Sequence, residues 1–164
     1  MTRLKGSLAK KDGATMRDFR HSLPMALLKA REAAMSRFRP MLREHGLTEQ
    51  QWRTIRTISA YERIDASELA RRSFLLSPSL TRILQFLERE NIIRRSSDPN
   101  DQRRSVLALT RKGQQIFSEV AFDSEILYHE IEADFGADKL AQLYELLAEF
   151  SKLSCDDQAQ ELAR

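Results

Sequence analysis

The sequence predicts a mainly α-helical fold with six helices and one β-hairpin. Only five of its 164 residues are glycine and four are proline, while 31% are charged, a composition typical of a helix-rich globular protein. Apolar residues recur every three or four positions in several segments, which is the period of an amphipathic helix. A turn-rich stretch, residues 98–101, separates two short apolar runs and predicts the hairpin.

Two helices are expected before residue 62. The first follows Ser22, with Pro24 in the first turn where proline is permitted, and ends at Gly46. Its apolar face is formed by Leu27, Leu28, Ala34, Met35, Phe38, Met41 and Leu42. The second begins with a capping box, in which the side chains of Thr48 and Gln51 each bind the other residue's backbone N–H, and should end near Tyr61.

The third and fourth helices are separated by a short linker. Asp65 is placed to cap a helix that runs to about Arg72. Ser77 is expected to cap the next helix, with Pro78 as its first residue. The apolar residues of this fourth helix fall on one stripe, which should face the core. They are Leu80, Ile83, Leu84 and Leu87.

The hairpin should be formed by residues 92–97 and 105–109, and Thr110 should end it and cap the fifth helix. A sixth helix is expected after Gly136. We therefore expect one domain over residues 20–153, with a basic flexible arm before it and a short tail, residues 154–164, after it.

Charge is distributed unevenly along the chain, although its net value is only +3. Residues 1–40 and 53–112 carry net charges of +7 and +6, whereas residues 113–164 carry −9. A basic middle segment indicates a surface that meets a polyanion. The chain contains no long uncharged apolar run, no secretory signal and a single cysteine, Cys155, so we expect a cytoplasmic protein without a disulfide or a membrane partner.

The element order of helix, short helix, turn, helix and hairpin predicts a winged helix-turn-helix that binds double-stranded DNA. In this arrangement the second helix of the pair enters the major groove. Arg82 and Gln85 are the expected base readers, because Arg pairs bidentately with guanine and Gln with adenine. The other contacts expected from the third and fourth helices are Ser67, Ser77, Pro78, Ser79, Thr81 and Arg89.

The tip of the hairpin carries two further arginines. A ribbon with arginine at its tip suits the narrow and strongly negative minor groove. We expect Arg103 and Arg104 to contact DNA there, with Asp101 orienting Arg103, and Arg95 to contact a phosphate.

Several of these motifs together resemble the MarR family. They are residues 65–70, the helix from Ser77, the D-x-R of Asp101 to Arg103, and the junction Leu109-Thr110-Arg111-Lys112-Gly113. Residues 22–24, 30–32, 38–40 and 46–53 are similar to the HpaR subgroup, whose members regulate homoprotocatechuate (4-hydroxyphenylacetate) degradation. The resemblance implies a homodimer on a pseudo-palindromic operator, with a lobe at residues 48–112 that binds DNA and helices at 20–46 and 113–153 that dimerise. It also implies a repressor that a small aromatic carboxylate releases from DNA.

An aromatic carboxylate needs a cationic clamp and apolar walls. Arg31, Arg39 and Arg53 are candidate clamps, and His21 is a further polar candidate. The candidate walls are Met35, Phe38 and Trp52.

Other functions remain open at this point or are disfavoured by the sequence. A MarR-type regulator of a different phenolic ligand or stress signal, or a winged helix that binds only proteins, would share these motifs. No nucleophile and base, phosphate loop or metal-ligand set occurs at a usable spacing, so we expect no enzyme, cofactor or metal. A cysteine redox sensor is disfavoured because Cys155 lies beyond the last helix.

Overall fold

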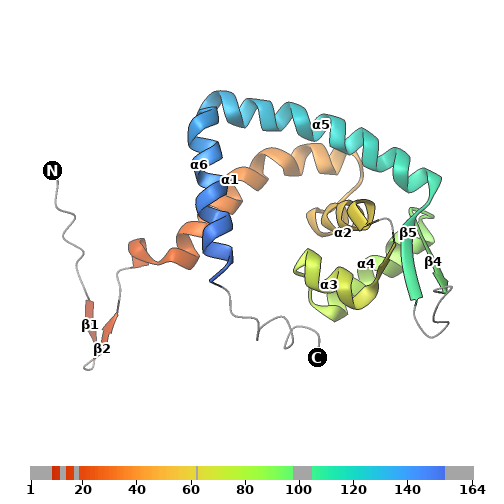
Figure 1. Ribbon diagram of the computed structural model, residues 1–164, viewed down its shortest axis with the longest axis horizontal. Coiled ribbons are helices and arrows are strands. Elements are labelled where there is room, and N and C mark those ends of the chain that lie inside the picture. The colour runs from red at the N-terminus through yellow and green to blue at the C-terminus, as the bar shows by residue number, and fades with distance from the viewer. Residues whose placement is uncertain (1–8, 12–13, 17–18, 62, 98–104, 154–164) are drawn as a thin grey trace. The chain divides into compact units, whose positions relative to one another are not determined.

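The computed structural model describes residues 9–11, 14–16, 19–61, 63–97 and 105–153 (Figure 1). The expected contacts Asp101, Arg103 and Arg104, the residue Cys155 and the tail at 154–164 lie outside these ranges. The chain divides into two units, residues up to Pro40 and residues from Met41 onward. Each unit is described by itself.

The first unit contains a short pair of strands and most of the first long helix. Strands β1 (Ala9–Lys11) and β2 (Ala14–Met16) pair antiparallel, which the sequence pattern did not predict. A 3₁₀ turn, η1 (Phe19–His21), precedes helix α1 (Leu23–Glu44). The helix begins at the expected residue, with Pro24 in its first turn.

The second unit contains the remaining helices and a small sheet. Its helices are α2 (Glu49–Tyr61), α3 (Ala66–Ser73), α4 (Ser77–Arg89), α5 (Arg111–Phe135) and α6 (Ala137–Ser151). Its strands are β3 (Ile64–Asp65), β4 (Ile93–Ser97) and β5 (Ser105–Leu109). Helices α2 to α4 and the sheet gather at one end of α5, and α6 follows its other end (Figure 1). The six predicted helices and the hairpin are confirmed.

The sheet contains one strand more than the predicted hairpin. Strand β5 lies in the middle, and both neighbours pair with it antiparallel, with Ile64 opposite Leu107 and Ile93 opposite Leu109. Two residues are too few to show the alternation by which a strand is recognised in sequence. The added strand places Asp65 at the end of β3, directly before α3.

Local hydrogen bonds fix the helix boundaries, and most follow the predicted caps. The Thr48 N–H donates to Gln51 Oε1 at 2.8 Å and the Gln51 N–H to Thr48 Oγ1 at 3.2 Å, which completes the capping box. Asp65 Oδ1 accepts from the Glu68 N–H at 2.8 Å. Thr110 Oγ1 accepts from the Gly113 N–H at 3.0 Å. These bonds satisfy N–H groups that have no partner within their own helix.

The prediction that Ser77 caps α4 is wrong. The Leu80 N–H donates to the Leu76 carbonyl at 3.0 Å, so the helix starts one residue earlier, with Leu76 as the N-cap and Ser77 as the first helical residue. No side chain caps this end. Pro78 becomes the second residue, where its missing N–H still costs no intrahelical bond.

The core of the second unit lies between α2, α3, α4, α5 and the sheet. Its largest fully buried apolar side chains from Met41 onward are Leu42, Ile55, Ile58, Leu69, Leu87, Leu107 and Val120. All four residues of the predicted apolar stripe of α4 are buried. The core therefore fixes which face of α4 points outward.

Large apolar side chains remain exposed along α5 and α6. Phe122 is 71% exposed, Leu146 63% and Tyr144 56%. Several large exposed apolar side chains on two consecutive helices indicate an interaction surface. No helix in the described ranges is long and apolar enough to cross a membrane.

Candidate nucleic-acid interface and effector site

The outer face of α4 combines cations with hydrogen-bonding groups. Thr81, Arg82, Gln85 and Arg89 are exposed on it, opposite the buried stripe. At the start of the helix Ser77 and Pro78 are exposed and Ser79 is half-buried. Eight DNA contacts were expected from α3 and α4. Six of them, all on α4, are exposed, and Ser67 in the first turn of α3 is exposed as well.

Arg82 and Gln85 are available to an external partner. Neither side chain makes a hydrogen bond or an ion pair with another of the described residues. Arg89, by contrast, lies 3.5 Å from Glu90 and 5.3 Å from the centre of the Phe86 ring. The two residues expected to read bases are therefore the less committed ones on this face.

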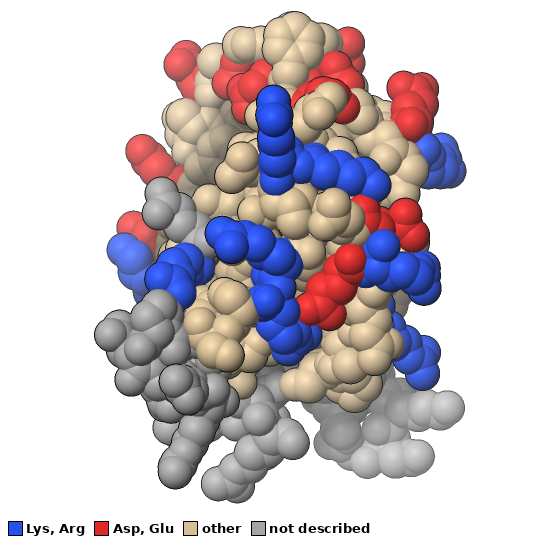
Figure 2. Space-filling model, turned by 90° about the vertical axis from the view of Figure 1, so that its right-hand side faces the viewer, with Lys and Arg blue, Asp and Glu red and all other residues tan. Residues whose placement is uncertain are grey.

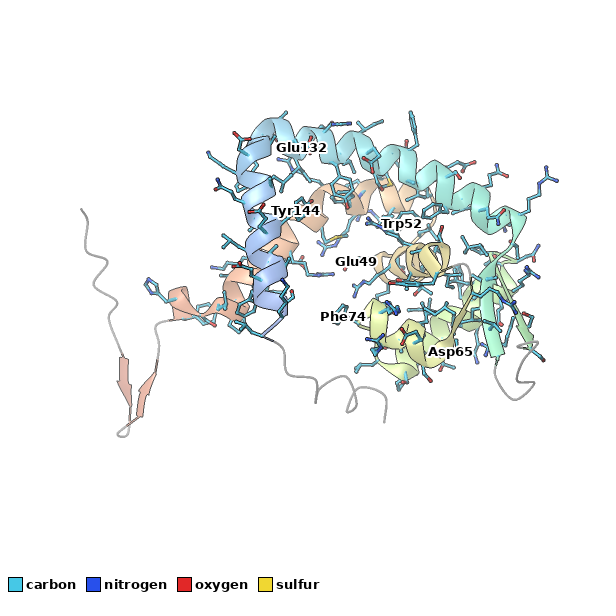
Figure 3. All side chains as sticks on the ribbon, in the orientation of Figure 1. Glu49, Trp52, Asp65, Phe74, Glu132 and Tyr144 are labelled. Atoms are coloured by element: carbon cyan, nitrogen blue, oxygen red, sulfur yellow. The ribbon has the colours of Figure 1, made fainter. Side chains whose placement is uncertain are left out.

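The turn between α3 and α4 sets the angle between the two helices. Phe74 ends α3 with a φ of 51°, in the left-handed region, and its N–H is held by carbonyls of the last turn of α3. The next residue, Leu75, is 6% exposed and is anchored in the core, whereas Phe74 is 82% exposed (Figure 3). A strained residue of this type persists only where the surrounding structure fixes the turn.

Glu68 on α3, the residue after Ser67, forms ion pairs with two arginines. Its carboxylate accepts from Arg71 Nε at 2.9 Å and Arg71 Nη2 at 2.6 Å, and also from Arg72 Nε. The Arg72 guanidinium lies 4.1 Å from the centre of the Tyr61 ring. The hydrogen bonds from Arg71 and then Arg72 lower the pKa of Glu68 to about 2.

Glu68 is accordingly expected to stay ionised in acid in which an ordinary glutamate is protonated. Because its folded pKa lies below the usual 4.5, its contribution to stability is present above pH 4.5 and is lost as the pH falls toward 2. A carboxyl-detected NMR titration of the folded protein measures the pKa directly. A midpoint near 4.5 would show that the arginines do not hold the carboxylate in solution.

The wing strands carry the last described DNA candidate, Arg95. Its Nε lies 2.9 Å from Glu88 Oε1 of α4. A phosphate contact by Arg95 would therefore have to share or replace this ion pair. The residues between β4 and β5 that were expected to reach the minor groove are not among those described.

In the first unit, the candidate effector clamps share one carboxylate. Arg31 Nη1 lies 2.9 Å from Glu32 Oε1, and Arg39 Nη2 lies 2.7 Å from Glu32 Oε2. Met35 is half-buried on the same helix, Phe38 is buried, and His21 is exposed before it.

In the second unit, Trp52 and Arg53 have different surroundings. The Trp52 ring stacks on Phe117 of α5, with centroids 5.7 Å apart. Arg53 Nη2 lies 3.1 Å from Glu49 Oε1, and Arg53 Nη1 donates to the Ser73 carbonyl at 3.1 Å. Arg53 thus connects α2 to the last residue of α3, so its guanidinium already has a structural role.

Arg56 was not among the candidate clamps chosen from the sequence. Its surroundings suit an aromatic carboxylate better than those of Arg53 do. It follows Trp52 by four residues on α2, so the two share one face of the helix. Its Nη1 donates to the Tyr128 hydroxyl of α5 at 3.4 Å, and it has no carboxylate partner among the described residues. The spacing of four from Trp52 was the available sequence signal.

These features define a class of protein. A helix-turn-helix pair whose second helix presents arginine and glutamine outward, followed by an antiparallel wing, is a winged-helix DNA-binding regulator. Residues 47–105 match the model of the MarR family.

Individual relatives extend the match beyond this lobe. The homoprotocatechuate degradative operon repressor of Escherichia coli is 46% identical over 132 residues, which are 80% of this chain and 89% of that protein. The crystal structure of transcriptional regulator PA4135 is 50% identical with a TM-score of 0.78, over 82% of this chain and 98% of that one. The crystal structure of NadR in complex with 4-hydroxyphenylacetate is 37% identical with a TM-score of 0.74, over 86% of this chain and all of that one. The chain belongs to the MarR family, and its predicted resemblance to the HpaR subgroup is confirmed.

Proposed function

We propose that this protein is a double-stranded-DNA-binding repressor of an aromatic-acid catabolic operon and that a small aromatic carboxylate releases it. The observation that carries DNA binding is the outer face of α4, where Arg82 and Gln85 are exposed and have no side-chain partner within the described ranges. The proposal of an aromatic effector rests on two relatives. One is a homoprotocatechuate degradative operon repressor, and the other, NadR, was crystallised in complex with 4-hydroxyphenylacetate. As a regulator it acts in the cytoplasm and catalyses no reaction.

The protein binds as a homodimer. Helices in residues 20–46 and 113–153 form the dimer interface, and the exposed apolar side chains of α5 and α6 supply part of the surface that it buries. Two equivalent copies of α4 related by a two-fold axis require a pseudo-palindromic operator with half-sites about 10 bp apart. Footprinting on DNA that flanks the protein's own gene tests this, and an asymmetric footprint of a single turn would contradict it.

Replacing Arg82 with alanine is expected to reduce discrimination between operator and scrambled DNA by about 1–3 kcal/mol, if Arg82 reads a guanine. Replacing Arg95, a phosphate contact in this proposal, should weaken binding to both sequences alike. Fluorescence anisotropy at one fixed salt concentration measures the dissociation constants of the parent protein and both variants on the two DNAs. Equal losses on both DNAs for Arg82→Ala would reject its role in base recognition.

The effector site is proposed to include Trp52, Arg56 and Tyr128. An aromatic wall, a guanidinium without a carboxylate partner among the described residues, and a phenol hydroxyl lie together on α2 and α5. Such groups bind a ring and its carboxylate. Arg31, Arg39 and Arg53 stay candidates, although each already contacts a carboxylate of the protein. The footprint repeated with a panel of aromatic acids tests whether any of them releases the operator.

A further inference from the structure

A cavity of about 540 Å³ lies behind the wing, and none of its described lining residues is a candidate contact of either site above. Its walls come from the C-terminal end of α2, from β4 and β5, and from the start of α5. Ligand pockets in proteins usually measure about 300–1,000 Å³, so the cavity is large enough for a small molecule.

The register of the sheet shows which face the cavity occupies. Arg94 lies opposite Ala108 and Ser96 opposite Val106, so these four side chains share one face. Arg95 has the alternate orientation and pairs with Glu88 of α4. The cavity is therefore on the face of the sheet that points away from α4, and a molecule bound there does not compete with the helix that enters DNA.

The charged side chains that line the cavity among the described residues are both positive. They are Arg63 and Arg94, and neither guanidinium has a hydrogen-bond or ion-pair partner in the part of the chain that the structure describes. Ser59, Ser96 and Gln114 add neutral hydrogen-bonding groups. Figure 2 shows several Lys and Arg side chains spread over the face of the second unit that includes the wing. Two guanidinium groups at one cavity, without an acidic partner among the described residues, favour a dianion.

The floor of the cavity is apolar. Ile58 is fully buried and Val106 is 8% exposed, and Ala108 and Leu109 complete this wall. Because Ile58, Val106 and Leu109 are already buried, this wall offers a ring or a short acyl chain van der Waals contacts rather than a large hydrophobic gain, and it offers nothing to a bare inorganic ion.

We propose that this cavity binds a small organic dianion, such as a phosphate monoester or a dicarboxylate carried on an apolar body. The two arginines hold the charged group, and the apolar body lies against the wall of Val106 and Ala108. The proposal goes beyond the function given above and does not depend on it, because binding at this cavity is measured without DNA.

Phenyl phosphate is a suitable probe, with inorganic phosphate and phenol as its two halves. The Ala108 methyl group reports on the cavity by NMR, and the Trp52 indole N–H reports on the effector site in the same sample. We expect phenyl phosphate to shift the Ala108 signal in the full-length protein, and each half alone to bind at least about tenfold more weakly.

The variants Arg63→Ala and Arg94→Ala should each weaken phenyl phosphate binding by about tenfold. Arg43→Ala is the matched control, since Arg43 is exposed at the end of α1 and does not line the cavity. Because the side chains of Arg63 and Arg94 are exposed and have no ion-pair partner among the described residues, these variants should fold as the parent does, and the unchanged Trp52 signal verifies this.

Three results would overturn the proposal. The first is a shift confined to Trp52, and the second is an Ala108 shift that persists in the double variant or is reproduced by inorganic phosphate alone. The third is a loss of affinity for scrambled DNA in Arg63→Ala and Arg94→Ala, without any phenyl phosphate binding, which would assign these arginines to the DNA backbone instead.

Discussion

Replacing Gly113 with alanine is expected to destabilise the fold more than any other single change considered for this chain. Gly113 is buried in the first turn of α5, and an added Cβ would lie 2.0 Å from the backbone oxygen of Ile92. That oxygen also accepts from the Thr110 N–H at 3.0 Å and from Thr110 Oγ1 at 3.2 Å. Any movement that relieves the contact therefore disrupts the junction between the wing and α5.

The expected cost is about 3 kcal/mol or more, the upper part of the range for overpacked sites. For a chain of this size it corresponds to a fall in Tm of roughly 6–12 °C. Thermal unfolding followed by circular dichroism measures it, at one protein concentration because dimerisation also affects Tm.

Gly46→Ala is a matched control for Gly113→Ala. Gly46 has a φ of +67° and no atom within 4 Å of an added Cβ, so its replacement incurs only the strain of a left-handed alanine, about 1–2 kcal/mol. A Gly113 variant that is no less stable than the Gly46 variant would show that the close contact with Ile92 relaxes without cost.

An aromatic carboxylate such as 4-hydroxyphenylacetate is expected to raise the operator dissociation constant about five- to 150-fold, the usual range of allosteric coupling. In Arg56→Ala this response should disappear while affinity for the operator without ligand stays nearly unchanged. The physical reason is linkage, since a ligand shifts the equilibrium only by its differential affinity for the free and DNA-bound conformations. Reciprocity requires that operator DNA weaken ligand binding by the same factor.

Arg53→Ala is the comparison that distinguishes the two clamps on α2. Arg53 is bound to Glu49 and to the Ser73 carbonyl, so its loss should affect stability more than the response to ligand. Calorimetry with the ligand and anisotropy with operator DNA, on both variants, give the two affinities. A response that survives in Arg56→Ala and is lost in Arg53→Ala would assign the clamp to Arg53, as the sequence first indicated.

The caps and helix faces could be predicted from sequence because they depend on residues close together in the chain. The capping box of Thr48 and Gln51 and the cap by Asp65 each join residues three positions apart. The stripe from Leu80 to Leu87 follows from the helical period alone. Local geometry of this kind is the same wherever the helix lies in the fold, so the outward position of Arg82 and Gln85 could also be predicted.

Features that join residues far apart in the chain could be known only from the tertiary structure. Strand β3 exists because β5 lies beside it, more than 40 residues later in the chain, and nothing in Ile64–Asp65 alone marks a strand. Arg53 and Arg56 are both arginines on α2. The i,i+4 spacing already gives Arg53 the carboxylate of Glu49, whereas only the packing of α3 and α5 gives Arg53 the Ser73 carbonyl and Arg56 the Tyr128 hydroxyl. The cavity behind the wing likewise forms from α2, the sheet and α5 together. Whether an arginine keeps an unneutralised charge depends on which side chains pack beside it in the folded chain. The sequence therefore shows where the arginines are but not which of them lack an acidic partner.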